Sequence, residues 1–120
     1  MMLSIPFHTT DWSAVSPVRY PGQNGYALWR TLHHDDLRIR MVEYSPGYTA
    51  DHWCTKGHII FCLEGSMITE LTDGRKFELR AGMSYQVSDD LSSHRSSSES
   101  GVRLLIFDGA FLKREKTFQM

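Results

Sequence analysis

Turn-forming residues recur at short, regular intervals from residue 37 to residue 108, and this spacing limits the fold more than any other feature of the chain. The segments between them are of strand length and rich in β-branched and aromatic residues, and none keeps a helical period. Leu37 to Met41 alternates strictly between apolar and charged residues, as a strand with one dry face does. Asp73-Gly74 is the strongest hairpin signal. The pattern predicts an all-β, antiparallel sandwich or barrel.

The length of 120 residues has room for one domain. We expect residues 1–36 to form an N-terminal arm and a first strand, with Tyr26 to Leu32 as that strand. Residues 37–108 would form the core of the barrel, and residues 109–120 a charged tail. No internal repeat or long linker interrupts this division.

Composition argues against several classes of partner. A net charge of −1 speaks against a nucleic-acid or anionic-membrane surface, which needs a clustered basic face. The longest apolar runs, Ile59 to Leu63 and Leu104 to Phe107, are far shorter than the roughly 20 residues of a membrane span. The N-terminus lacks the pattern of a secretory signal, and two cysteines do not make a disulfide framework. These features predict a cytoplasmic protein.

Histidine and cysteine gather in the segment from residue 50 to residue 65. If residues 50–54 are extended, His52 and Cys54 point to one face, and His58 opens the next strand after a turn. Antiparallel pairing of the two segments would bring the three side chains together, with cross-strand neighbours about 5 Å apart. Imidazole and thiolate on one face suit a transition metal. The alternative is a group of satisfied polar residues on a half-buried surface.

The same segment resembles the first motif of the cupin superfamily, which runs Gly, five residues, His-x-His, three or four residues, Glu, six residues, Gly. Here Gly47 is followed after four residues by His52-Trp53-Cys54, then His58 and Gly65. The second motif begins at Gly82, and His94 comes one residue later than the family's histidine. The amino-acid sequence of residues 50–58 resembles that of the small cupins named for an Asp-His-Cys-Trp motif, a subgroup with no settled activity. The resemblance covers residues 37–108 and implies a single cupin-type antiparallel β-barrel, a jelly-roll-like double-stranded β-helix.

The resemblance implies four metal-contacting positions, which are His52, Cys54, His58 and His94. Cysteine stands where the motif has its second histidine, and histidine stands where it has glutamate. This donor set moves the preference from iron or manganese toward zinc, copper or nickel. We expect one divalent transition metal, with zinc favoured and nickel, copper or iron as alternatives. Four protein ligands would close the site, whereas three histidines with Cys54 standing back would leave a position open.

Further residues have more than one interpretation each. Cys62 is a pocket candidate on the face of His58, a small buried hydrophobe, or a disulfide partner of Cys54. Gln86 is a pocket candidate because the motif places residues 84 and 86 on the cavity side. Hydrophobic patterning instead places Met83, Tyr85 and Val87 inside. Arg95 is an exposed loop residue or a contact for an anionic substrate.

Three functions compete at this stage. The first is a metalloenzyme that acts on a small molecule in the barrel, the second a binding or sensor module, and the third a structural zinc site. The sequence has no triad, paired carboxylates or phosphate loop, so no catalytic residue is assigned and enzymatic activity stays undecided. By resemblance to small cupins, which pair to protect their edge strands, we expect a homodimer.

Overall fold

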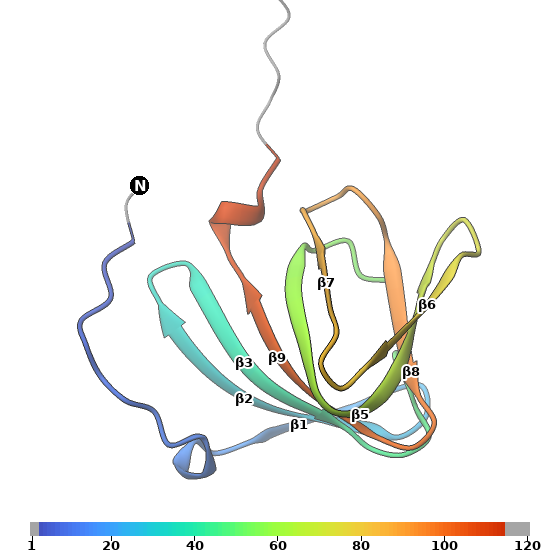
Figure 1. Cartoon of the computed structure of the whole chain (residues 1–120), viewed down its shortest axis with the longest axis horizontal. Helices are drawn as coiled ribbons and strands as arrows, with labels where there is room; N and C mark the ends of the chain where they lie inside the picture. The colour runs from blue at the N-terminus through green and yellow to red at the C-terminus, as the bar shows by residue number, and fades with distance from the viewer. Residues whose placement is uncertain (1–2, 115–120) are drawn as a thin grey trace, which may run out of the picture.

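Nine strands and two short 3-10 turns make up the regular structure of residues 3–114, the part of the chain that the computed structural model describes (Figure 1). The strands are β1 (Val18–Pro21), β2 (Tyr26–His34), β3 (Leu37–Tyr44), β4 (Tyr48–Thr49), β5 (His58–Leu71), β6 (Lys76–Arg80), β7 (Ser84–Val87), β8 (His94–Ser98) and β9 (Val102–Asp108). The turns are η1 (Trp12–Ala14) and η2 (Ala110–Leu112). No helix within residues 3–114 is long and apolar enough to span a membrane.

All strand pairs are antiparallel, in the order β1-β2-β3-β9-β5-β8-β4, with β6 and β7 also paired to β5. The 14-residue strand β5 joins the two halves of the barrel. Its first half pairs with β7 and β9, and its second half pairs with β6 and β8. The register shifts between Cys62 and Glu64, and Gly65 follows with a φ of 76°. A side chain at Gly65 would collide with the carbonyl oxygen of Gly101, so glycine is required where β5 bends.

The inward-pointing residues of β3, β5 and β9 alternate with outward-pointing ones and form the core. The buried residues are Val42, Ile60, Cys62, Met67, Leu79, Val102, Leu104 and Ile106. The predicted all-β antiparallel barrel is confirmed, as is the hairpin at Asp73-Gly74, which joins β5 to β6.

The predicted pairing of residues 50–54 with the strand that begins at His58 is wrong. Residues 51–53 are not extended but contain a bend that leads into Cys54, whose backbone pairs with that of His94 through N–H···O bonds of 2.8 and 3.0 Å. The start of β5 is already paired on both sides, with Val87 of β7 opposite His58 and Phe107 of β9 opposite Ile59. A strand has only two edges, so no edge of β5 is free for residues 50–54.

Candidate metal centre

Cys54, His58 and His94 meet on the inner side of the barrel, although they come from three separate segments. Cys54 precedes β5, His58 is the first residue of β5, and His94 is the first residue of β8. One ligand atom from each side chain lies within 4.8 Å of the other two. The Cys54 Sγ atom is 3.5 Å from His58 Nε2, and the two imidazole rings lie edge to face at 5.4 Å. The backbone bridge between residues 54 and 94, and not the predicted strand pairing, therefore holds Cys54 close to the two histidines.

Hydrogen bonds fix both imidazoles with Nε2 toward the group. His58 Nδ1 lies 2.9 Å from Asp108 Oδ2, and His94 Nδ1 lies 3.0 Å from the carbonyl oxygen of Ser92. A carbonyl or carboxylate oxygen only accepts, so each Nδ1 carries a proton, and in the neutral ring each Nε2 presents a lone pair. His94 Nε2 is buried and has no hydrogen-bond partner among the described residues. Such an orphaned acceptor calls for a partner in the space that it faces.

Asp108 is the buried anion behind His58. Arg38 donates two hydrogen bonds to its carboxylate at 2.8 and 2.9 Å, and Arg40 donates one at 2.8 Å. Only 1% of the Asp108 side chain is exposed, and the Arg40 guanidinium lies over the Trp29 ring at 4.3 Å. Burial alone would raise the pKa of Asp108, but His58 and the two guanidinium groups hold it well below its usual range. Asp108 is therefore a carboxylate that orients His58.

Sequence reasoning missed the role of Asp108. The signal was present: Val102, Leu104 and Ile106 alternate inward, and Asp108 continues the same phase. Arg38 and Arg40 occupy inward positions of the neighbouring strand β3. Opposite charges that point inward from adjacent strands indicate a buried ion pair. This can be recognised only when the strand order β3-β9-β5 is known, because that order makes β3 and β9 neighbours.

The electrostatics of the group favour a thiolate. Burial raises the pKa of the Cys54 thiol. Hydrogen bonding to the neighbouring imidazoles of His58 and His94 outweighs this effect and brings the pKa down to about 5. For His94, burial lowers the pKa, because it disfavours the charged ring. The sulfur of Cys54 and the carbonyl of Ser92 outweigh burial and raise the pKa of His94 above its ordinary value. Cys54 thus offers a charged sulfur donor beside two imidazoles.

The described residues fit a divalent metal. A thiolate and two imidazole lone pairs converge, and the buried Nε2 of His94 has no other partner. Three protein ligands and one open position are the arrangement of catalytic zinc sites, whereas closed structural sites have four protein ligands.

His52 stays outside this group. Its side chain is 72% exposed, and Nδ1 lies 2.6 Å from Asp51 Oδ1. The alternation that was expected to align His52 with Cys54 does not hold, because residues 51–53 are not a strand. His52 still contributes to the wall of the cavity that holds the group.

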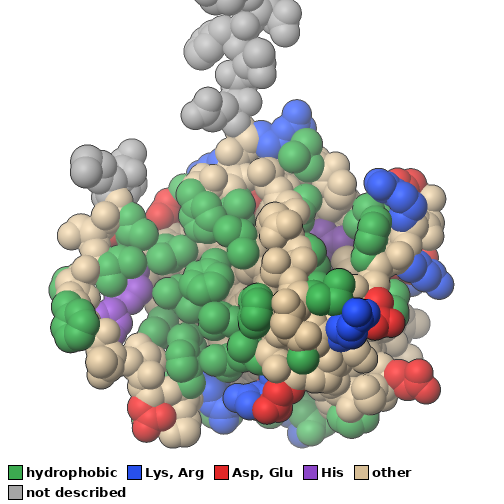
Figure 2. Space-filling model, viewed as in Figure 1, with side chains coloured by type: hydrophobic (Ala, Val, Ile, Leu, Met, Phe, Trp, Pro, Cys, Tyr) green, Lys and Arg blue, Asp and Glu red, His purple; other side chains and the backbone are tan. Residues whose placement is uncertain are grey.

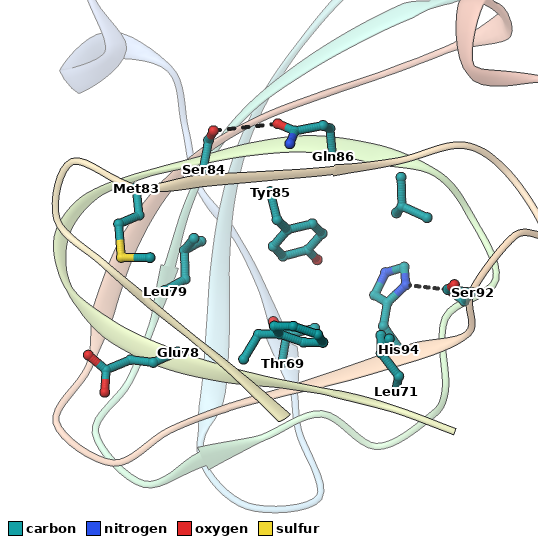
Figure 3. A pocket seen from close by; sticks show the side chains of 12 residues that line it. Thr69, Leu71, Glu78, Leu79, Met83, Ser84, Tyr85, Gln86, Ser92 and His94 are labelled. Carbon is teal, nitrogen blue, oxygen red and sulfur yellow. Dashed lines mark hydrogen bonds between the residues drawn. The ribbon is translucent and has the colours of Figure 1, made fainter. Parts of the chain in front are cut away.

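Two cavities adjoin the three side chains. The polar cavity, about 250 Å³, is lined by Cys54, His58 and His94, by arginines, by Lys56 and by aromatic residues. The apolar pocket, about 300 Å³, is lined by residues of β5, β6 and β7 such as Leu79 (Figure 3). Both cavities share His94 and Tyr85, whose rings lie edge to face with their centroids 6.0 Å apart (Figure 3). The candidate centre therefore lies where a small molecule can reach it.

Of the two pocket candidates from the sequence, Gln86 lines the apolar pocket and Cys62 lines neither cavity. Cys62 is fully buried in the core and lines neither cavity, which agrees with its interpretation as a small hydrophobe. Cys54 and Cys62 are both free thiols, so the disulfide alternative does not hold. Gln86 touches the edge of the apolar pocket, but its side chain is exposed, bonds Ser84 at 3.4 Å and points away from Tyr85 (Figure 3). Hydrophobic patterning was the better guide on β7, because Tyr85 points into the barrel.

No family model matches the chain, and no curated protein matches it. Several solved structures do match it in fold. A protein from Thermotoga maritima described as a predicted oxalate decarboxylase superposes with a TM-score of 0.74 at 15% identity, over 85% of this chain and 98% of its own. A sugar phosphate isomerase of the cupin superfamily from Silicibacter pomeroyi gives 0.66 at 13% identity, over 85% and 75%. The chain has the cupin fold.

Ectoine synthase from P. lautus supports the same fold, with a TM-score of 0.68 at 16% identity over 86% of this chain and 78% of its own. The sequence resemblance to cupins is thus confirmed at the level of the fold. At these identities the likeness carries no activity to this chain. Membership of the Asp-His-Cys-Trp subgroup stays a prediction.

Proposed function

We propose that this cupin binds one divalent transition metal through Cys54, His58 and His94 and presents it to a small molecule in the polar cavity. The observation that carries the proposal is the convergence of three donor atoms within 4.8 Å, one of them a buried imidazole nitrogen with no other partner. Thiolate with two imidazoles favours zinc, while nickel, copper and iron are the alternatives. His52, at the wall of the same cavity, is the remaining candidate from the sequence.

The protein's own residues prepare the site. Asp108 holds the proton on His58 Nδ1, and the Ser92 carbonyl holds the proton on His94 Nδ1, so both Nε2 atoms keep their lone pairs. A metal bound here supplies Lewis acidity to a ligand at its open position. Whether that ligand is transformed or only bound separates the metalloenzyme from the binding module. A structural zinc with four protein ligands is less favoured, because the fourth candidate, His52, lies outside the group.

Cobalt titration of the metal-free protein tests this proposal. We expect about one equivalent of Co²⁺ per chain, with an intense near-ultraviolet thiolate-to-cobalt band and displacement by zinc. Chelator should lower the melting temperature of the loaded protein, because a ligand that binds only the folded state stabilises it. Absence of the sulfur band together with a melting temperature that ignores chelator would refute the metal site.

The row Cys54–His58–Asp108 supports a second candidate, a thiol nucleophile. Sγ lies 3.5 Å from His58 Nε2, and Nδ1 of the same ring lies 2.9 Å from Asp108 Oδ2. This is the order of nucleophile, base and orienting carboxylate in cysteine hydrolases. The metal is preferred because it uses all three converging donor atoms, whereas the nucleophile gives no role to His94. In the cobalt titration, the nucleophile predicts no metal uptake.

For the assembly we propose a homodimer that pairs through the outer apolar face. This face consists of outward-pointing residues on β2, β3, β9 and β5: Leu32, Ile39, Met41, Ile59, Phe61, Leu105 and Phe107. They form continuous cross-strand rows, and apolar side chains gather over these strands in Figure 2. A two-fold axis through the face would lay the same apolar rows on each other, so a second copy satisfies it without another partner.

Phe61→Glu is expected to weaken this dimer about 30-fold or more, because Phe61 is 40% exposed within the face and the change would bury an unpaired carboxylate. Analytical ultracentrifugation of the variant measures the loss. Phe77→Glu is the control, since Phe77 is similarly exposed but lies on β6, away from the face. A wild-type protein that sediments as a monomer at micromolar concentration would contradict the dimer.

A further inference from the structure

The polar cavity has an unbalanced wall. Its lining includes Arg38, Arg40, Lys56 and Arg95, and among the described residues that line it there is no aspartate or glutamate, so the Cys54 thiolate is the one negative group facing these four cations. Asp108 lies behind the wall and pairs with both Arg38 and Arg40, so one negative charge serves two positive ones. Arg40 Nε is also buried without a hydrogen-bond partner among residues 3–114. The cavity thus keeps positive charge and an unused donor on a partly dehydrated surface.

Two of these cations lack a firm internal partner. Arg95 has one long contact, 3.5 Å from Nη2 to Glu70 Oε1, and its guanidinium lies over the Trp53 ring at 4.7 Å. Stacking steadies the guanidinium plane and leaves its edge free to donate hydrogen bonds. Lys56 makes no ion pair within the described part of the chain. Lys56 has no competing ion pair among these residues and Arg95 has only a long one, so both are available to a ligand.

The position of these cations ties them to the metal candidates. Lys56 lies between Cys54 and His58 in the chain, and Arg95 directly follows His94. All of them line the same cavity of about 250 Å³, a volume that admits a small molecule of roughly eight to ten non-hydrogen atoms. A ligand that reaches the three donor atoms therefore lies close to Lys56 and Arg95.

We propose that the polar cavity recognises a small molecule by an anionic group, a carboxylate or a phosphate, which Arg95 and Lys56 bind at the rim. This inference deepens the proposed function, on which it rests insofar as the anion would share the cavity with the metal. Arg95 suits a two-oxygen contact through its planar edge, and Lys56 adds a mobile point charge.

Calorimetric titration of zinc-loaded and metal-free protein at low ionic strength tests the proposal, with succinate, inorganic phosphate and neutral succinamide as probes. We expect one anion to bind at one equivalent and succinamide to bind at least about 10-fold more weakly. Arg95→Gln and Lys56→Gln should each weaken anion binding about 5- to 10-fold without changing the metal content. A preference for succinate identifies a carboxylate ligand, and a preference for phosphate identifies a phosphate ester.

Arg75→Gln and Arg80→Gln are matched controls, because both arginines are exposed near or on β6 and line neither cavity. If succinamide binds as well as succinate, if no anion binds, or if the rim variants behave like the controls, the inference fails. Metal content is measured in the same samples. Full metal content without anion binding overturns this inference alone, whereas anion binding by a protein that takes up no zinc overturns the proposed metal site alone.

Discussion

Cys54→Ser is expected to lower the affinity for zinc at least about 100-fold. A residue that only orients a metal ligand already contributes about 10- to 100-fold to affinity, and Cys54 offers a charged sulfur within 4.8 Å of both imidazole nitrogens. Serine keeps the size of the side chain but stays protonated at neutral pH, so the anionic donor is lost. Competition with a chromophoric chelator measures the affinity, and elemental analysis measures the metal retained after dialysis.

Cys62→Ser is the matched control and should keep the metal. Cys62 is buried in the core, and its Sγ lies 3.6 Å from the carbonyl oxygens of Glu64 and Gly65, to which a serine hydroxyl can donate. Equal metal retention in the two variants would remove Cys54 from the ligand set. Equal loss in both would show that the loss reflects damage to the barrel, and the metal assignment would then lack support.

Asp108→Asn is expected to destabilise the metal-free protein by about 3–5 kcal/mol. The carboxylate holds Arg38, Arg40 and His58 at 2.8–2.9 Å, and its replacement by a neutral amide leaves the buried guanidinium of Arg40 and the half-buried one of Arg38 without their counter-charge. The measurement is urea denaturation of metal-free wild type and variant, so that loss of bound metal does not enter the difference. In the loaded protein the same change should weaken zinc binding about 10- to 100-fold, because His58 loses the acceptor that fixes its ring.

Glu78→Gln is the control for this effect. Glu78 pairs with Arg80 at 3.3 Å, but both side chains are largely exposed, so the change should alter the free energy of unfolding by less than about 1 kcal/mol. An Asp108→Asn protein as stable as the control variant would mean that the buried network contributes little. A variant with normal stability and normal zinc affinity would exclude Asp108 from both roles.

Local patterns predicted the strands well, and the reasons are visible in particular residues. Arg38 and Arg40 alternate with Ile39 and Met41, and the structure places the two pairs on opposite faces of β3. The alternation left open which face is the inner one, and the structure shows the arginines pointing inward, where Asp108 and Trp29 contact them. Alternation shows that a strand has two different faces. It does not show which of them points into the barrel, because a buried counter-charge can draw the charged face inward.

The candidate site was predicted in part. Cys54, His58 and His94 could be chosen because their residue types and their resemblance to cupin motifs point to metal ligands. His52 was grouped with them by a strand alternation that the bend at residues 51–53 breaks. Asp108, 50 residues from His58 along the chain, could not be chosen, because its contact depends on the pairing of β9 with β5.

By itself, the sequence determined the β architecture, the hairpin at Asp73-Gly74 and the kinds of donor atom available, since turn chemistry and period-two patterning act over a few neighbouring residues. The tertiary structure alone decided which donors meet. The bridge between Cys54 and His94, the carboxylate behind His58 and the cationic lining of the polar cavity all join segments far apart in the chain. Contacts of that kind follow from strand order and barrel closure, which no local pattern encodes.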